Sequence, residues 1–313
     1  MVELSIILNT GRDDYPMIGL PQTFIFEPTI LSLNKQELQN FELVIVDGCW
    51  SERRAKWTLA HATFPLKHLN ALPNRFLENG MIAISSMKNK GIINAEGELV
   101  VFVDDCTQFE PWWTKRLWSW YEKGYWPMSM TRYLRGGEAI TVHDSRAQLV
   151  GSGTRLAFPS MFYGGSSATL DALLRVNGLD ERFDGKKSLE DVDLGERLSV
   201  AGALGVFMLD SEFYHYENAH GDISREVFRV NVPVCNYGLL LESKVEREPR
   251  ANTRLLKRED AERIRSRICP ICPNYQRCLI ETFKGKFFLE SDGYELWLKL
   301  QQTIDLKEER LSE

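Results

Sequence analysis

Two pairs of adjacent acidic residues stand where carboxylates can do chemistry. Asp104 and Asp105 come directly after the apolar run Leu99 to Val103, and Glu190 and Asp191 begin a helical pattern. Because a buried charge is costly, paired acids at the end of a buried strand usually meet a cation or solvent. The second pair also suits an ordinary helix start, where the dipole favours acids. The first pair is therefore expected to meet a cation or solvent, and the second allows more than one interpretation.

Other polar residues follow or precede predicted strands. Thr10 and Asp47 each come just past a strand, where doubly wound sheets bind nucleotides, although Asp47 with the glycine after it also suits a simple turn. Lys88, Asn89 and Lys90 lie on a helix that leads into the strand before Asp104. By themselves these residues suit a solvated charged face.

The cysteines form a separate pattern near the C-terminus. The sequence contains Cys49, Cys106, Cys235, Cys269, Cys272 and Cys278. Cys269, Cys272 and Cys278 have the spacing of a zinc knuckle, and Cys235 or His220 is the candidate fourth ligand of a structural Zn²⁺. Reduced free thiols are the alternative in a reducing compartment, and an iron–sulfur cluster is a third interpretation.

Short apolar strands alternate with helices in the first half of the chain. The predicted strands are Leu4 to Leu8, Phe41 to Val46, Leu66 to Leu69 and Glu98 to Val103, and the predicted helices are Pro28 to Gln39, a segment from Ser51, and Asn79 to Ala95. This rhythm predicts an α/β fold with a mostly parallel, Rossmann-like central sheet and helices on both faces. The loops at the carboxyl ends of the strands would form the site.

The second half continues with more helix and ends in a different pattern. A helix from Pro111 places Trp113, Leu117 and Trp120 on one face, which predicts core packing, with a sugar-stacking platform as the alternative. Further predicted elements are the helices Ala168 to Val176 and Glu190 to Ala201 and the strand Leu204 to Leu209. After Asp222 the sequence becomes charge-rich and mainly helical. We therefore predict a domain over 1–222 and a helical C-terminal extension with the cysteine cluster over 223–313.

Composition limits the class of protein. The 313 residues are 43% hydrophobic and 26% charged, which predicts a large core. A formal net charge of -6 argues against nucleic acid as the main partner. The first residues suit a strand rather than a signal peptide, and we expect no transmembrane segment. The expected location is the cytoplasm, at most peripheral to a membrane; the oligomeric state is not predicted.

Taken together, these motifs resemble glycosyltransferase family 2. The resemblance rests on Ser5-Ile6-Ile7-Leu8-Asn9-Thr10, Phe41-Glu42-Leu43-Val44-Ile45-Val46-Asp47-Gly48, Asn89-Lys90-Gly91, Gly97-Glu98, Phe102-Val103-Asp104-Asp105, Asn177-Gly178-Leu179-Asp180-Glu181 and Glu190-Asp191-Val192-Asp193-Leu194, in this order over roughly residues 2–222. It implies a GT-A fold, with a donor half over about 1–110 and an acceptor half over about 111–222. It also implies an inverting hexosyltransferase that moves a sugar from a nucleotide-diphosphate sugar, most simply a UDP-sugar, to a hydroxyl of a glycan or other acceptor.

The resemblance assigns residues to the donor. The implied donor-binding residues are Thr10, Arg12, Asp47, Lys88, Asn89, Asp104, Gly165 and Ser166. Thr10, Arg12 and Asp47 would hold the base and ribose, and Lys88 would neutralise the diphosphate. Gly165 and Ser166 follow another glycine, so the backbone there can approach a sugar ring closely; an ordinary loop is the alternative.

The family's DxD motif implies Mn²⁺ or Mg²⁺ against the diphosphate, since a divalent ion stabilises the leaving group. Aligned on the strand, Asp104 matches the first acid, Asp105 the middle residue, and Cys106 the second acid. We expect Asp105 to substitute as ligand; weakened metal binding and a softer ion held by the thiolate are the alternatives. His215, or else His220, would complete the metal site.

The second acidic pair gains a role from the same resemblance. Asp191, with Glu190 beside it, would be the general base that takes the proton of the acceptor hydroxyl. A non-catalytic relative that binds a sugar nucleotide or glycan is the main alternative, because Cys106 replaces a motif acid. A nucleotidyltransferase is a third possibility, but a Gly-rich basic phosphate loop is missing near Gly11.

Overall fold

The computed structural model describes most of the first 216 residues. The described residues are 2–11, 24–74, 77–79, 83–135, 138–144, 146, 155–156, 162, 164–184, 189–200, 205–216 and 251. Arg12, His220, Cys235, Cys269, Cys272 and Cys278 lie outside them, as does almost all of the predicted extension over 223–313. The predicted domain boundary and the structural Zn²⁺ therefore stay predictions.

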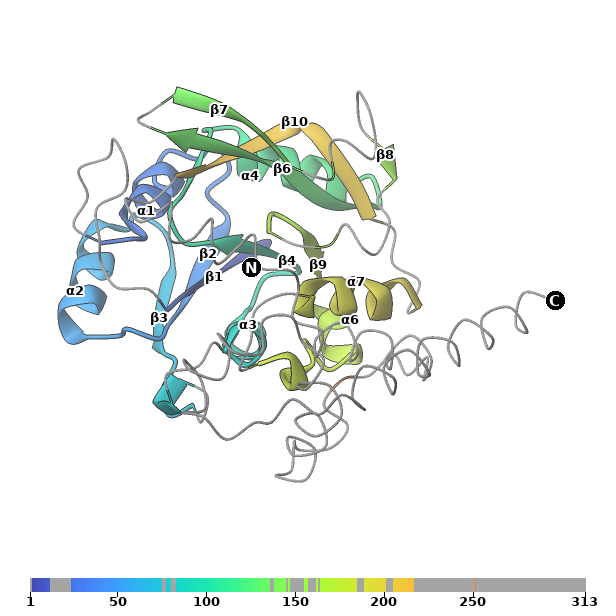
Figure 1. The fold of residues 1–313 in the computed structure, drawn as a ribbon. Coiled ribbons are helices and arrows are strands. Elements are labelled where there is room, and N and C mark those ends of the chain that lie inside the picture. The colour runs from blue at the N-terminus through green and yellow to red at the C-terminus, as the bar shows by residue number, and fades with distance from the viewer. Residues whose placement is uncertain are drawn as a thin grey trace, which may run out of the picture.

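A central sheet forms the middle layer of the fold (Figure 1). Its strand order is β3-β2-β1-β4-β9, with bounds β1 Leu4–Thr10, β2 Phe41–Asp47, β3 Leu66–Asn70, β4 Leu99–Asp104 and β9 Ser167–Thr169. β1 to β4 run parallel, and β9 pairs antiparallel with β4. The register sets Thr10 opposite Asp47, and Asn9 opposite Asp104. The carboxyl ends of the three inner strands thus bring these side chains to one edge.

Helices cover both faces of this sheet. The helices are α1 Glu27–Leu33, α2 Glu52–His61, α3 Ile84–Asn94, α4 Trp113–Tyr121, α6 Leu170–Arg175 and α7 Glu190–Val200, with single 3₁₀ turns η1 Leu77–Asn79 and η3 Glu181–Phe183. Along β1, Ile6 and Leu8 pack in a core shared with α1 and α4, whereas Ile7 packs in a core shared with α3, α6 and α7. This alternation follows from the two-residue period of a strand. The predicted fold class is confirmed.

A second sheet packs beside the first. Its strands are β5 Thr107–Phe109, β10 Gly205–Tyr216, β6 Trp126–Arg135 and β7 Glu138–His143, in the order β5-β10-β6-β7, and β8 Arg155–Leu156 pairs with β10. β10 is longer than the predicted strand and continues through a register shift between Met208 and Glu212. His215 therefore lies within β10, where it is opposite Thr107 of β5.

The tryptophan-rich helix α4 packs into the core, as predicted. Trp113 and Leu117 are fully buried, and the indole N–H of Trp113 donates to Ser129 Oγ of β6 at 3.0 Å.

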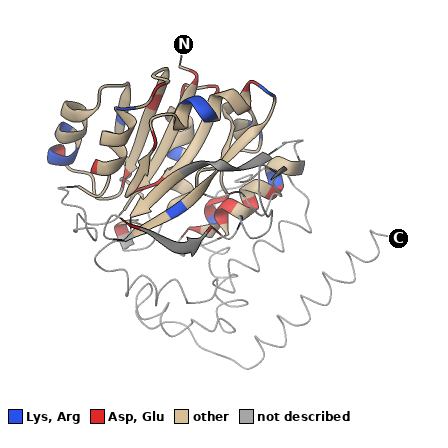
Figure 2. Ribbon diagram, turned by 90° about the horizontal axis from the view of Figure 1, so that it is seen from above, with Lys and Arg blue, Asp and Glu red and all other residues tan. Residues whose placement is uncertain are grey.

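The strands carry few charged residues, whereas the outer helices carry both signs (Figure 2). Among the described residues, no helix is long and apolar enough to cross a bilayer.

Candidate active site

A line of polar side chains crosses the carboxyl edge of the central sheet. Thr10 Oγ1 donates to Asp105 Oδ2 at 2.9 Å, and Cys106 Sγ lies 3.6 Å from Asp105 Oδ1. On its other side, Cys106 Sγ lies 3.7 Å from His215 Nε2. Three elements, β1, the end of β4 and β10, thus contribute to one polar chain.

The two acids after β4 face different surroundings. Asp104 is exposed, whereas Asp105 is only 2% exposed and turned toward Thr10. Gly164 comes close to the exposed acid, because a Cβ built on it would lie 3.2 Å from Asp104 Oδ2. Asp105, expected from the sequence as the metal ligand, instead holds the end of β1 to the end of β4.

Cys106 is fully buried and has a positive φ of 54°. A non-glycine residue rarely adopts this conformation, so the neighbouring structure must impose it. The backbone N–H of Cys106 donates to Ile25 O at 3.2 Å, and its carbonyl accepts from Tyr216 N at 2.9 Å. The turn after β4 is therefore fixed between the loop before α1 and the end of β10.

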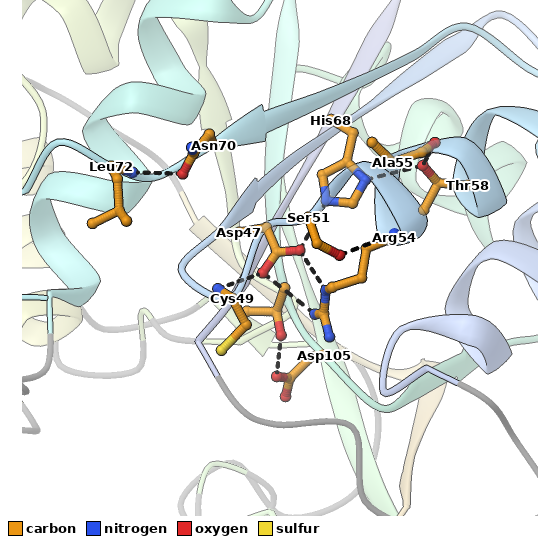
Figure 3. Close-up of polar contacts among 11 residues, drawn as sticks. Asp47, Cys49, Ser51, Arg54, Ala55, Thr58, His68, Asn70, Leu72 and Asp105 are labelled. Carbon is orange, nitrogen blue, oxygen red and sulfur yellow. Dashed lines mark hydrogen bonds and ion pairs between the residues drawn. The ribbon is translucent and has the colours of Figure 1, made fainter.

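Asp47 is the centre of a buried polar network (Figure 3). Its Oδ1 accepts from the backbone N–H of Cys49 at 2.8 Å, and its Oδ2 accepts from Arg54 Nε at 2.7 Å. His68 Nε2 lies 2.9 Å from Asp47 Oδ2, and Arg54 lies over the ring of Phe26 at 4.8 Å. Asp47 was expected to receive hydrogen bonds from the donor, but internal partners engage both of its carboxylate oxygens.

Sequence reasoning missed the partners of Asp47. Arg54 lies in the first turn of α2, and Ser51 caps that helix by accepting from the Arg54 N–H at 3.3 Å. The short spacing between Asp47 and Arg54 was a signal for this ion pair. No local signal pointed to His68, which arrives from β3 through strand pairing with β2.

The predicted phosphate-binding residues on α3 make contacts with different parts of the fold. Asn89 Nδ2 donates to Leu179 O at 2.9 Å, and Asn89 Oδ1 accepts from Leu179 N at 2.7 Å. A Cβ on Gly178 would lie 2.3 Å from Asn89 Oδ1, so this turn needs glycine. Lys90 Nζ donates to Asn70 O at 2.5 Å. Asn89, expected at the donor, thus clamps the turn before η3, and Lys90 ties α3 to the end of β3.

Lys88 lies on the same helix but belongs to a different cluster. Its Nζ lies 5.5 Å from the centre of the Phe102 ring on β4. Its positive charge acts on Asp191, as do the negative charges of Glu190 and Asp104. Asp104 of β4, Lys88 of α3, and Glu190 and Asp191 of α7 therefore bring charges of both signs close together.

The surroundings shift the pKa of Asp191. Removal from water, and then the charge of Glu190, raise the pKa of Asp191 to about 7, while Lys88 acts in the opposite direction. Leu189, just before the helix, has a positive φ of 75°, so the chain turns sharply into α7. A half-buried carboxylate with this pKa suits proton transfer near neutral pH.

A buried ion pair between Arg146 and Asp144 holds the glycine-rich segment before β9 in place. Arg146 Nη2 donates to Asp144 Oδ2 at 2.7 Å and to Gly164 O at 3.0 Å. Its Nη1 donates to Ser166 Oγ at 3.3 Å. Gly165 has a φ of 80°, and a Cβ there would lie 2.4 Å from the Phe213 ring. Both predicted residues, Gly165 and Ser166, are buried, so the arginine fixes the backbone of this segment.

The expected Mn²⁺ or Mg²⁺ site does not fit these residues well. Such ions take several oxygen ligands, and Mg²⁺ keeps much of its water. Within the described part of the chain, no group of three or more His, Cys, Asp or Glu side chains is arranged to hold a metal. Asp105 is engaged by Thr10, and a thiol stands at the third position of the motif.

These elements build a GT-A fold. The chain is similar to S. aureus TarS, a family 2 glycosyltransferase, with a TM-score of 0.53 and 14% identity over 94% of this chain and 47% of TarS. A structure of TarS 1-349 in complex with UDP-GlcNAc gives a TM-score of 0.52 and 14% identity, over 89% of this chain and 72% of that one. At this identity the likeness shows the fold alone. The chain spans about half the length of TarS.

Comparisons of the sequence with protein families and with curated proteins give no match. No protein-family model matches the chain, and no curated protein matches it. The fold is therefore established by the arrangement of elements, and the chemistry has to be argued from the site itself.

Proposed function

We propose that this protein is an inverting glycosyltransferase that uses a nucleotide-diphosphate sugar. One observation carries the proposal: removal from water, then Glu190 and Asp104, raise the pKa of Asp191 against the opposing charge of Lys88, so acids from both halves of the fold act on one region. A GT-A-like sheet with its carboxyl edge beside this region is suited to hold a nucleotide. The complex of TarS with UDP-GlcNAc supports a UDP-sugar as the first donor to test.

In the proposed reaction, Asp191 accepts the proton of an acceptor hydroxyl while that oxygen attacks the anomeric carbon. The carbon–oxygen bond to the diphosphate breaks on the opposite side of the sugar, which gives inversion. Glu190 keeps Asp191 basic by its negative charge, and Lys88 offers a cation to the phosphates. Thr10, whose hydroxyl donates to Asp105, borders the place proposed for the base and ribose.

The buried residues support this arrangement rather than touch the donor. Asp47 with Arg54 and Asn89 with Leu179 hold the strand ends and the turn before η3 in place. Arg146 holds the backbone of Gly164 next to Asp104. We propose a hexosyl group as the transferred sugar and a glycan or other hydroxyl compound as the acceptor.

The test starts from the donor. A thermal-shift panel of UDP-, GDP- and dTDP-sugars identifies the nucleotide, because a ligand of the native state raises its apparent stability. Transfer of labelled sugar is then compared between the wild type and Asp191→Asn. We expect transfer to fall by at least about 100-fold with little change in donor affinity, since a positioned base contributes about 10²- to 10⁴-fold.

Glu196→Gln is the matched control, because Glu196 lies on the same helix and loses the same charge. Its transfer rate should stay within about twofold of the wild type, because the proposed reaction gives Glu196 no role. If Asp191→Asn transfers sugar as fast as Glu196→Gln, Asp191 is not the base. If no sugar nucleotide raises the melting temperature, the glycosyltransferase proposal fails as a whole.

A further inference from the structure

One residue of the predicted C-terminal extension lies against the turn after α6 (residues 176–179). Ala251 is the only residue after Tyr216 that the structure describes, and it is 4% exposed. Its backbone N–H donates to Val176 O at 2.9 Å, and its carbonyl accepts from Asn177 Nδ2 at 2.9 Å. Both main-chain polar groups of this buried residue are therefore paired by the turn, as a buried backbone requires.

The side chain of Asn177 is not explained by the backbone of the turn. Asn177 follows the end of α6 and has a positive φ of 58°. Glycine is the commonest residue at such a helix end, because it adopts this conformation without strain, and Asn is found there less often. What the Asn side chain adds is the hydrogen bond to Ala251 O, which a glycine lacks.

Arg197 of α7 reaches the same turn. Its Nη1 donates to Val176 O at 3.1 Å and to Gly178 O at 2.7 Å. Val176 O thus accepts hydrogen bonds from both Arg197 and Ala251. Because the guanidinium is buried and charged, its hydrogen bonds are of the stronger kind. The extension and α7 therefore meet at one carbonyl oxygen.

The turn is also connected to the helices that carry Asp191 and Lys88. Arg197 Nε donates to Asp193 Oδ2 at 2.8 Å, and Asp193 lies in the same first turn of α7 as Asp191. Asn89, the neighbour of Lys88 on α3, accepts from a backbone N–H of the turn at 2.7 Å. A displacement of the turn would therefore move α7 relative to α3.

We propose that Ala251 anchors the C-terminal extension to the turn after α6, and that this anchor positions α7 for the reaction. The second half of this inference rests on the proposed function. There, Asp191 has to lie within hydrogen-bond reach of the acceptor hydroxyl, and a misplacement of about 1 Å can cost about 10²-fold in rate. Donor affinity should change little, because the donor is assigned mainly to the strand ends.

Two substitutions in the full chain break the contact from opposite sides. Asn177→Gly removes the amide donor and keeps the backbone conformation, and Ala251→Glu places a charge where a buried methyl group lies. Asn34→Ala is the control for the first, because Asn34 Nδ2 donates to His61 O at 2.7 Å between α1 and α2. Ala60→Glu, at an exposed position of α2, is the control for the second. Melting temperatures report whether each variant is folded.

Hydrogen exchange without any ligand tests the anchor. Mass spectrometry with fragmentation isolates the Ala251 amide, which should be protected in the wild type and exchange about tenfold faster in Asn177→Gly, as for loss of one hydrogen bond. The amides of α7 should exchange faster in Asn177→Gly and Ala251→Glu, and as in the wild type in both controls. Free exchange of the Ala251 amide in the wild type overturns the inference, as does an α7 that responds to neither variant.

Kinetics test the positioning of α7. With the donor identified by the thermal-shift panel, kcat of sugar transfer should fall about tenfold or more in Asn177→Gly and Ala251→Glu, while the dissociation constant of the nucleotide stays within about twofold. Both controls should keep the wild-type kcat. An unchanged kcat in variants whose α7 exchanges faster overturns the positioning role. Absence of transfer by the wild type contradicts the proposed function alone, and hydrogen exchange then still decides the anchor.

Discussion

At the scale of single residues, the charge on Asp191 depends on neighbours from three elements. Removal from water and Glu190 disfavour the carboxylate, and Lys88 favours it. With a pKa raised to about 7, Asp191 is protonated in a growing share of molecules as the pH falls below 7. A base must be unprotonated to act, so sugar transfer should decline on the acid side through this range.

Lys88→Met should move that decline to higher pH. Without the cation, the pKa of Asp191 rises further, so the acid limb of kcat shifts to higher pH. The measurement is kcat against pH at saturating donor. Lys56→Met is the control, because Lys56 is 79% exposed on α2 and should leave the limb in place. An unmoved limb in Lys88→Met would show that the two charges do not interact.

At the scale of elements, α3 begins with help from a residue far along the chain. Ala83 precedes the helix and offers no side-chain cap. Asp184, after η3, accepts from the backbone N–H groups of Ser85 at 2.7 Å and Ser86 at 2.9 Å. It thus fills the capping role and ties the donor-side helix to the segment before α7.

Asp184→Ala should lower the free energy of unfolding by about 1 to 2 kcal/mol, as for loss of a helix cap. Urea unfolding at pH 8 measures this change. Burial raises the pKa of Asp184 to about 6, so its carboxylate is ionised at pH 8. Asp171→Ala is the comparison, because its ion pair with Arg175 is exposed and should contribute well under 1 kcal/mol. Equal losses in both variants would contradict the capping role.

At the scale of the whole molecule, buried ion pairs join the layers. Arg146 and Asp144 connect β6 with the segment before β9, through the carbonyls of Ser129 and Gly164. Arg197 pairs with Asp193 within α7, and its Nη1 donates to Gly178 O at 2.7 Å. Arg146 thereby holds Gly164 beside Asp104, and Arg197 holds the turn at Gly178 that Asn89 also contacts.

Arg146→Met should destabilise the fold by about 3 to 5 kcal/mol, since it leaves Asp144 buried without its arginine. The double variant Arg146→Met with Asp144→Asn should recover part of the loss, which denaturant unfolding of both single variants and the double variant shows. Lys115→Met breaks an exposed pair with Glu37 and should cost less than 1 kcal/mol. No recovery in the double variant would mean that the buried charge is not the cause.

The strands were predictable because their signal is local. The apolar run before Asp104 identifies β4, and the run from Phe41 identifies β2, each within a residue of its bounds. β10 was predicted too short, because its second part contains Asp210, Ser211 and Glu212 and depends on pairing with β6. Local hydrophobic periodicity fails where a neighbouring strand supplies the stability.

The sequence by itself determined which polar residues stand at the carboxyl ends of the parallel strands, since chain order and strand length fix that edge. Only the tertiary structure decided which way they face. The positive φ of Cys106 turns the chain so that Asp104 is exposed and Asp105 meets Thr10. Asn89 meets Leu179 across 90 positions of sequence. Such contacts arise when separate elements pack together, and no local pattern encodes them.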